Sequence, residues 1–194
     1  MRARIRKSLG LAVAALAMLG TSLAAAPSAS AAPHTDRFAA QARAAHLTDA
    51  QSASLRSEVD RILVKTGGKQ VALNEIDLNG QGRVMVAIPG ETHPRDFVSA
   101  AGAVYSDPCL EGPVYSGYFC AYSQPTFQGS EIQMYYCQSY SMPWGGYGSW
   151  VNDQTAGTRA RFYGSGGSLL YTTPGAYSSN QNYYWTPVWT IRPC

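Results

Sequence analysis

The second half of the chain alternates short strand-forming runs with glycine-rich breaks, and this pattern restricts the fold more than any other feature. All 13 tyrosines, 4 tryptophans and 4 cysteines lie beyond Ala103, and helical periodicity is absent there. Short, closely spaced strands with turn signals between them are typical of a compact all-β sandwich, which we expect over residues 104–194. The runs that we expect to be strands are 118–122, 131–137, 158–163, 168–172 and 185–191.

The N-terminal residues have the pattern of a secretory signal peptide. A basic start (residues 2–7) precedes an alanine- and leucine-rich run (9–26) and an A-x-A-like cleavage site (29–31). The run is too short and too rich in alanine for a membrane anchor. We therefore expect residues 1–31 to be removed on export, leaving a secreted, extracellular protein without a membrane contact.

The four cysteines suit an exported protein that contains disulfide bonds. Cys109, Cys120, Cys137 and Cys194 lack the C-x-x-C spacing and the nearby histidines of a zinc site, and an oxidising compartment favours disulfides. Four cysteines permit three pairings, and the sequence does not choose among them. We favour the sequential pairing, 109 with 120 and 137 with 194, which would close one short loop.

Residues 32–103 have a more ordinary charged composition and predict a small helix followed by a hairpin. Thr48 can cap a helix, and Gln51 can complete a capping box. The helix should end at the glycines 67–68, and apolar alternation on both sides of residues 79–82 indicates two strands. Such a segment is either a permanent subdomain or a propeptide that is later cleaved off, and both interpretations stay open.

Three stretches in the aromatic region, residues 118–122, 127–129 and 150–155, carry a resemblance to a known family. Tyr122 and Phe127 lie five residues apart, and Gly129 follows two residues later. This is the spacing of a beta-gamma-crystallin Greek key, in which the aromatic pair folds over a hairpin and the glycine adopts a conformation closed to other residues. Cys120 precedes the motif and Trp150 follows about one strand pair later. Together these residues resemble the secreted bacterial beta-gamma-crystallin-like group that contains metalloproteinase inhibitors, peptidase inhibitor family I-thirty-six.

The resemblance covers roughly residues 109–163. It implies a disulfide-stabilised Greek-key β-sandwich, preceded here by the helix and hairpin, with peptidase inhibition as the best-known activity. Inhibitors of this group present the reactive bond on a disulfide-constrained loop. The one short loop that we can propose, Cys109 to Cys120, precedes the Greek key, so the resemblance assigns no reactive residue. The turn Ser139 to Ser149 is a second candidate surface.

The resemblance also raises a calcium site. Calcium-binding members of the wider superfamily use two adjacent Asn or Asp residues, two spacers and then two hydroxyl residues, whereas Ala156 and Gly157 follow Thr155 here. Asn152 and Asp153 are therefore at most a calcium half-site. Their alternative role is to hold a turn through side-chain bonds to the backbone. We expect no other cofactor.

The residue inventory of the second half argues against catalysis. Residues 104–194 contain no histidine and no lysine, which removes the usual bases for activating a nucleophile. Glu111, Glu131 and Asp153 could in principle form an acid and base pair, but no spacing singles them out. Three arginines stand against four acidic residues in this region, so no electrostatic footprint for nucleic acid exists. We predict a protein that is not an enzyme.

Two functions from different classes follow from these observations. The first is a secreted peptidase inhibitor whose partner is a secreted peptidase. The alternative is an extracellular carbohydrate- or cell-wall-binding module without catalytic activity, in which Tyr140, Trp144 and Tyr147 form an exposed stacking surface at the glycine-rich turn. The partner would then be a glycan.

Overall fold

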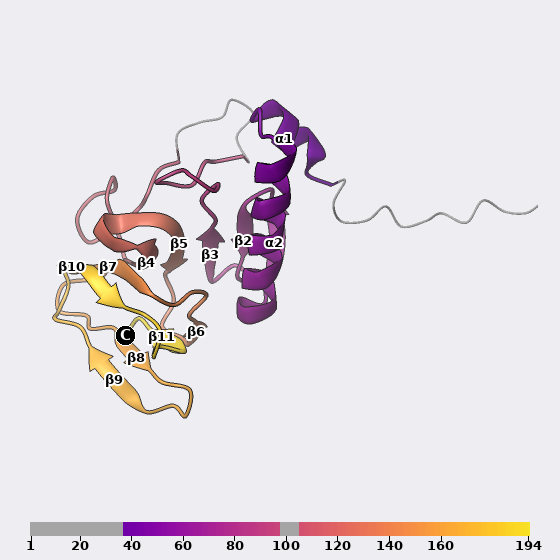
Figure 1. Ribbon diagram of the computed structural model, residues 1–194. Coiled ribbons are helices and arrows are strands. Elements are labelled where there is room, and N and C mark those ends of the chain that lie inside the picture. The colour runs from indigo at the N-terminus through magenta and orange to yellow at the C-terminus, as the bar shows by residue number, and fades with distance from the viewer. Residues whose placement is uncertain (1–36, 98–104) are drawn as a thin grey trace, which may run out of the picture. The chain divides into compact units, whose positions relative to one another are not determined.

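The computed structural model describes residues 37–97 and 105–194. The predicted signal peptide and the small-residue linker at 99–103 lie outside the described residues. The described chain is mostly β, with two antiparallel sheets and a helical segment before the first strand (Figure 1). This confirms the β-rich fold expected for the second half. Within the described ranges, no helix has both the length and the apolar character that crossing a membrane requires.

Two helices open the described chain, α1 (Ala39–Ala44) and α2 (Asp49–Thr66). The predicted capping box is present at α2: the Thr48 hydroxyl accepts the Gln51 amide at 3.2 Å, and the Gln51 side chain accepts the Thr48 amide at 3.1 Å. The helix ends at Gly67, whose φ of 70° suits glycine. The start and end of this helix therefore follow from its own sequence.

Three strands follow where a two-stranded hairpin was predicted: β1 (Lys69–Ala72), β2 (Glu75–Asp77) and β3 (Gly82–Met85). The turn between β1 and β2 was not predicted because it contains no glycine or proline. Asn74 stabilises this turn instead, since its buried side chain donates to the carbonyl oxygen of Val86 at 3.0 Å.

The larger sheet has seven strands in the order β1-β2-β3-β5-β4-β7-β10, and the smaller sheet has four in the order β6-β11-β8-β9. The N-terminal meander is part of the larger sheet because β3 pairs with β5. The remaining strands are β4 (Tyr118–Gln124), β5 (Gln128–Met134), β6 (Tyr140–Ser141), β7 (Tyr147–Asp153), β8 (Arg161–Tyr163), β9 (Leu169–Thr172), β10 (Ser178–Tyr184) and β11 (Thr190–Arg192).

The strands from β4 to β11 form two units with the same connections. In each unit the first two strands are a hairpin, and the fourth strand returns beside the first: β7 pairs with β4, and β11 pairs with β8. The third strand of each unit joins the sheet of the other unit, because β6 pairs with β11 and β10 pairs with β7. Each sheet therefore contains strands from both units.

Four of the predicted strands occur with shifted ends as β4, β5, β8 and β9, whereas the strand predicted over 185–191 shares only residues 190 and 191 with β11. Three strands were missed. β6 has only two residues, β7 begins with a glycine-containing stretch that reads as a turn, and β10 is polar and largely exposed. Pairing with β7 places β10 in the sheet despite its composition.

The larger sheet has two differently covered faces. Along β4, Phe119 and Ala121 belong to the main core, whereas Cys120 and Tyr122 belong to a smaller cluster on the opposite face. The main core joins buried residues of α2 to both sheets, and Arg61 of α2 donates to the Pro143 carbonyl oxygen at 2.9 Å. The N-terminal segment and the β-sandwich thus share one core.

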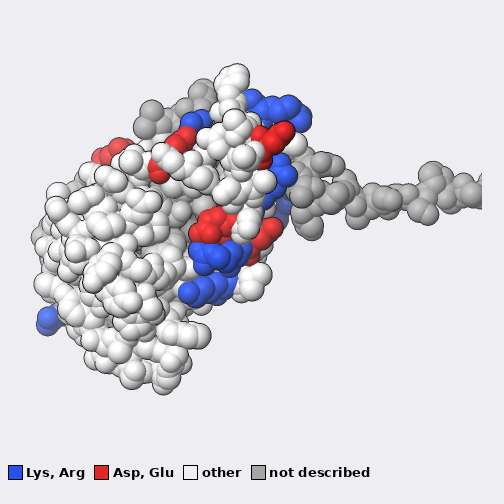
Figure 2. Space-filling view, viewed as in Figure 1, with Lys and Arg blue, Asp and Glu red and all other residues white. Residues whose placement is uncertain are grey.

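Charge is distributed unevenly over this fold. In the face shown in Figure 2, acidic and basic side chains gather over the N-terminal helices, while the surface over the sandwich is almost free of them. The ion pairs follow the same distribution: Arg61 with Glu58, Arg83 with Glu75, and Arg95 with Glu91 all lie in the N-terminal segment.

Both disulfides have the sequential pairing that we favoured. Cys109 is bonded to Cys120, and Cys137 is bonded to Cys194. The first closes a loop on the outer face of the larger sheet, and the second attaches residue 194 to the end of the β5 hairpin. Disulfide bonds indicate folding in an oxidising environment.

Candidate functional site

The disulfide Cys109–Cys120 closes a loop whose middle is exposed. Both sulfur-bearing residues are buried, at 4% and 0% exposure, against the outer face of the larger sheet. Because β4 begins at Tyr118, residues 110–117 form the part of this loop that is free of strand pairing. We call residues 110–117 the closed loop. One end is thus fixed by the bridge and the other by the sheet.

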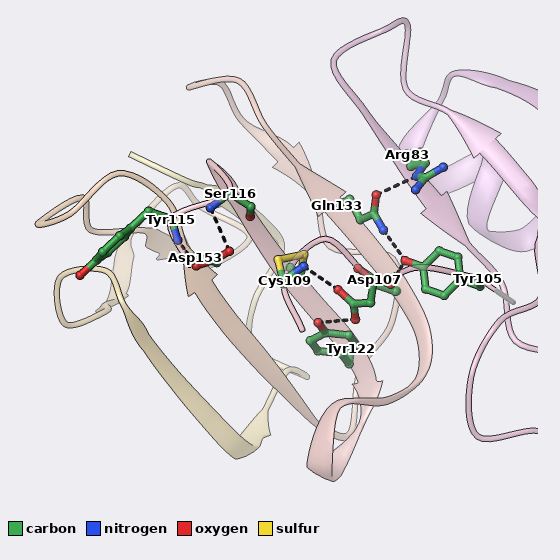
Figure 3. The surroundings of a disulfide bond; sticks show 11 residues. Arg83, Tyr105, Asp107, Cys109, Tyr115, Ser116, Tyr122, Gln133 and Asp153 are labelled. Carbon is green, nitrogen blue, oxygen red and sulfur yellow. Dashed lines mark hydrogen bonds between the residues drawn. A yellow bond between two sulfur atoms is a disulfide. The ribbon is translucent and has the colours of Figure 1, made fainter. Parts of the chain in front are cut away.

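Asp107 holds the first end of the closed loop (Figure 3). Its carboxylate accepts the Cys109 amide and the Tyr122 hydroxyl, both at 2.8 Å. Its carbonyl oxygen accepts the amides of Leu110 at 3.2 Å and Glu111 at 2.8 Å. Asp107 is 6% exposed, so these bonds are shielded from water.

Asp153, the last residue of β7, holds the second end of the closed loop; it pairs with Tyr118 at the start of β4. Its two carboxylate oxygens accept the amides of Tyr115 at 2.6 Å and Ser116 at 3.0 Å, and its carbonyl oxygen accepts the Gly117 amide at 2.9 Å (Figure 3). Such charge-assisted bonds are stronger than bonds between neutral groups. They hold Tyr115 at a φ of 67°, in the left-handed region.

These contacts bear on the calcium half-site that we considered at Asn152 and Asp153. Both oxygens of Asp153 bind loop amides, and the Asn152 amide donates to the Thr158 carbonyl oxygen at 2.9 Å. The Asn152 amide thus holds the nearby turn at Thr158, Asp153 holds a loop that is distant in the sequence, and the calcium half-site stays a prediction. Among the described residues, the acidic and cysteine group nearest to a metal-binding arrangement is Asp107, Cys109 and Cys120, but its sulfurs form the disulfide.

The middle of the closed loop presents apolar side chains to solvent. Leu110, Val114 and Tyr115 are 41%, 65% and 49% exposed. Glu111 is the one charged residue of the closed loop. The loop therefore offers fixed backbone and apolar side chains, a combination suited to contact with another protein surface.

A network of buried polar side chains supports the residues that lead into the loop. The Tyr105 hydroxyl donates to Glu131, Gln133 donates to Tyr105, and Arg83 donates to Gln133 at 2.7 Å (Figure 3). Burial raises the pKa of the Glu131 carboxyl well above its usual range, and the negative charge of Asp107 raises it further. Burial likewise raises the pKa of Asp107.

The residues of the proposed fold motif have the local geometry that we expected. Tyr122 and Phe127 meet edge to face with ring centroids 5.7 Å apart, and Gly129 has a φ of 83°. A Cβ atom on Gly129 would lie 2.2 Å from the Ser123 hydroxyl oxygen, so only glycine fits there. Trp150 is 1% exposed and belongs to the main core.

The prediction of an exposed aromatic surface at the glycine-rich turn is wrong. Tyr140 and Trp144 are buried, at 4% and 7% exposure, and only Tyr147 is exposed. Ser139 to Ser149 is not a simple turn, because it contains β6 and the start of β7. A small sandwich needs these large side chains for its core.

Neither of the contacts that anchor the closed loop, at Asp107 and at Asp153, was predicted. Asp107 precedes Pro108 and Cys109, and an Asp that bonds the backbone two residues on is a known turn signal. Asp153 lies 38 residues from Tyr115 in the sequence, and nothing in the sequence indicates that contact.

The chain matches no known family model, and comparisons with curated proteins and with solved structures give no significant match either.

Proposed function

We propose that the protein is a secreted peptidase inhibitor and that residues 110–117 are its peptidase-binding loop. A segment that inhibits a peptidase must enter the cleft as a substrate does and yet resist cleavage. Fixing the bound shape in advance lowers the entropy lost on binding. The observation that carries the proposal is that the closed loop is fixed at both ends by buried groups while Leu110, Val114 and Tyr115 remain exposed.

Two further features support the family on which this proposal rests. β7 returns to lie beside β4, as the fourth strand of a Greek key lies beside its first, and Tyr122 and Phe127 pack against each other near Gly129, which has a positive φ. We therefore propose a beta-gamma-crystallin-like fold. Secretion is supported by the signal-peptide pattern of residues 1–31 and by the two disulfides.

The side chains of the closed loop indicate the type of peptidase. A peptidase that selects lysine or arginine has an acidic specificity pocket, and the closed loop contains neither residue. Apolar side chains such as Val114 fit a hydrophobic specificity pocket. We infer that the target is a metallopeptidase or a serine peptidase with an apolar pocket.

The direct test titrates the full chain, with both disulfides verified, against thermolysin-like, subtilisin-like and trypsin-like peptidases. We expect stoichiometric inhibition of one of the first two and none of the third. Val114→Asp should abolish that inhibition, because it would place a charged side chain in the apolar specificity pocket of the peptidase. Leu169→Asp is the matched control, since Leu169 is also exposed, at 56%, but lies on β9. Inhibition that survives Val114→Asp would refute the assignment of the loop.

A second test addresses the rigidity of the loop. In Asp153→Asn one carboxylate oxygen becomes an amide donor, so it no longer accepts a loop amide. The variant should turn from inhibitor into substrate, with cleavage within residues 110–117 detected by mass spectrometry. Replacing Cys109 and Cys120 together should have the same effect, provided that the double variant is still folded. Equal inhibition by all three proteins would show that loop rigidity has no role.

A further inference from the structure

A pocket of about 510 Å³ lies on the same outer face of the larger sheet as the closed loop. Its volume is within the range of small-molecule sites. The register aligns its floor across three strands, because Asp77 of β2 pairs with Arg83 of β3, and Arg83 pairs with Gln133 of β5. The side chains on which the inference depends are Glu75, Asp77, Arg83, Gln133, Tyr135 and Tyr136.

The polar side chains of the pocket are fixed before any ligand arrives. Arg83 donates through Nε to Gln133 at 2.7 Å, and its Nη1 lies 3.7 Å from a Glu75 carboxylate oxygen. Gln133 also donates to the buried Tyr105 hydroxyl (Figure 3). The Asp77 carboxylate accepts the Gly80 amide, with both oxygens at 3.1 Å. Gln133 is buried and fully used in orienting Arg83, so the Arg83 guanidinium and the Glu75 and Asp77 carboxylates are the groups that can bond to adjacent hydroxyls of a ligand.

Aromatic rings form the other wall. Tyr135 and Tyr136 are 50% and 54% exposed, with ring centroids 5.3 Å apart, and Tyr118 lies 5.0 Å from Tyr135. The backbone of Tyr136 is attached to the opposite wall through a buried side chain: the Tyr140 hydroxyl accepts the Tyr136 amide at 3.3 Å and donates to the Gln81 carbonyl oxygen at 2.7 Å. The two walls therefore have a fixed separation.

The charges of the pocket define the class of ligand. The two carboxylates repel an anion, and the Arg83 guanidinium, whose Nη1 lies 3.7 Å from Glu75, offsets part of their charge and so weakens the attraction for a cation. The lining is too polar for a lipid chain. A neutral molecule with many hydroxyls and apolar C–H faces fits, since its faces can pack on tyrosine rings while its hydroxyls bond to the planar groups.

We propose that this pocket binds a neutral carbohydrate of two or three sugar units. The site is distinct from the surface proposed earlier at the glycine-rich turn, and it depends on the N-terminal segment, which supplies Glu75, Asp77 and Arg83. Inhibition through the closed loop is a separate property, so either proposal can fail while the other holds.

The test is calorimetric titration of the full chain with soluble tetrasaccharides of β-1,4-linked N-acetylglucosamine, β-1,4-glucose, β-1,3-glucose and α-mannose. We expect saturable binding of at least one. Tyr136→Ala should weaken that binding on the order of tenfold because a stacking ring is lost, and Tyr136→Phe should retain it. Arg83→Met should also weaken it, because it keeps the length of the side chain but removes the donors.

Tyr147→Ala is the matched control, since Tyr147 is 61% exposed and lies on β7 outside the pocket. It should bind as the unmodified chain does. Thermal melts of each variant separate loss of binding from loss of folding. Absence of saturable binding to all four sugars at millimolar concentration overturns the proposal. Equal affinities of the Tyr136→Ala variant and the unmodified chain overturn the location.

Discussion

At the scale of single residues, the burial of the Glu131 carboxyl group on folding should make the folding stability depend on pH. Glu131 lies on the outer face of β5, 1% exposed, with Tyr105, Asp107, Gln133, Arg83 and Tyr122 around it. Because its pKa is raised in the folded state, the folded chain retains a proton that the unfolded chain releases above a pH of about 4.5. Folding stability should therefore fall as the pH rises from there, by up to about 1.4 kcal/mol per pH unit.

Glu131→Gln should remove this dependence. The variant has the same shape and no charge, so we expect it to be more stable than the unmodified chain at neutral pH and nearly equal to it near pH 4. The raised pKa of Asp107 should leave a weaker slope of the same sign. Urea unfolding at a series of pH values measures the effect, with the exposed Glu111→Gln as control. Parallel profiles for the unmodified chain and Glu131→Gln would contradict it.

Gly129 and Gly157 allow two reasons for a glycine to be compared: a positive φ alone, and a positive φ together with a lack of space for a Cβ atom. Both have positive φ, 83° and 85°, but a Cβ at Gly129 would meet Ser123 whereas a Cβ at Gly157 would meet nothing within 4 Å. Gly157→Ala should cost only the backbone strain, about 1–2 kcal/mol. Gly129→Ala should cost clearly more. Chemical denaturation of both variants tests this, and equal losses would show that the close contact at Ser123 relaxes freely.

At the scale of elements, the pairing of β3 with β5 joins the N-terminal segment to the sandwich. The partners run from Gly82 with Met134 to Met85 with Glu131. Without residues 37–97, β5 would become an edge strand with unpaired backbone groups and a partly uncovered core face. The chain from 105 to 194 alone should therefore associate or melt at a clearly lower temperature, as seen by analytical ultracentrifugation and calorimetry.

Adding residues 37–97 as a separate fragment is the control for that experiment. It should restore a monomeric sandwich if the loss comes from the exposed edge. A truncated chain that is monomeric and melts unchanged would instead favour the propeptide interpretation of residues 32–103, which the sequence left open beside a permanent subdomain.

Elements with local signals were predictable, and elements defined by distant partners were not. The α2 capping box and the end at Gly67 involve neighbours within a turn, and the sequence shows both. β10 has few apolar residues and is a strand because β7 lies beside it. The same distinction applies to the site: the loop between Cys109 and Cys120 was predicted, whereas its anchor at Asp153 comes from another strand.

At the scale of the molecule, one core connects all parts of the described chain, so we expect one unfolding transition. Leu55, Val59 and Ile62 of α2 belong to the same buried cluster as Trp150 and Phe162 of the two sheets. Far-ultraviolet circular dichroism follows the helix and tryptophan fluorescence follows the sandwich. The two melting curves should coincide. Curves that separate by several degrees would mean that the N-terminal segment unfolds independently.

The exchange of third strands between the two units also limits the order in which the strands can pair during folding. In a chain that is exported starting from its N-terminus, β3 must wait for β5, and β6 must wait for β11. β11 comprises residues 190–192, so β6 has no neighbour in the smaller sheet until nearly the whole sandwich has been made. Until then, apolar strands of the first unit remain uncovered. Such a chain is exposed to aggregation until its last strand is available.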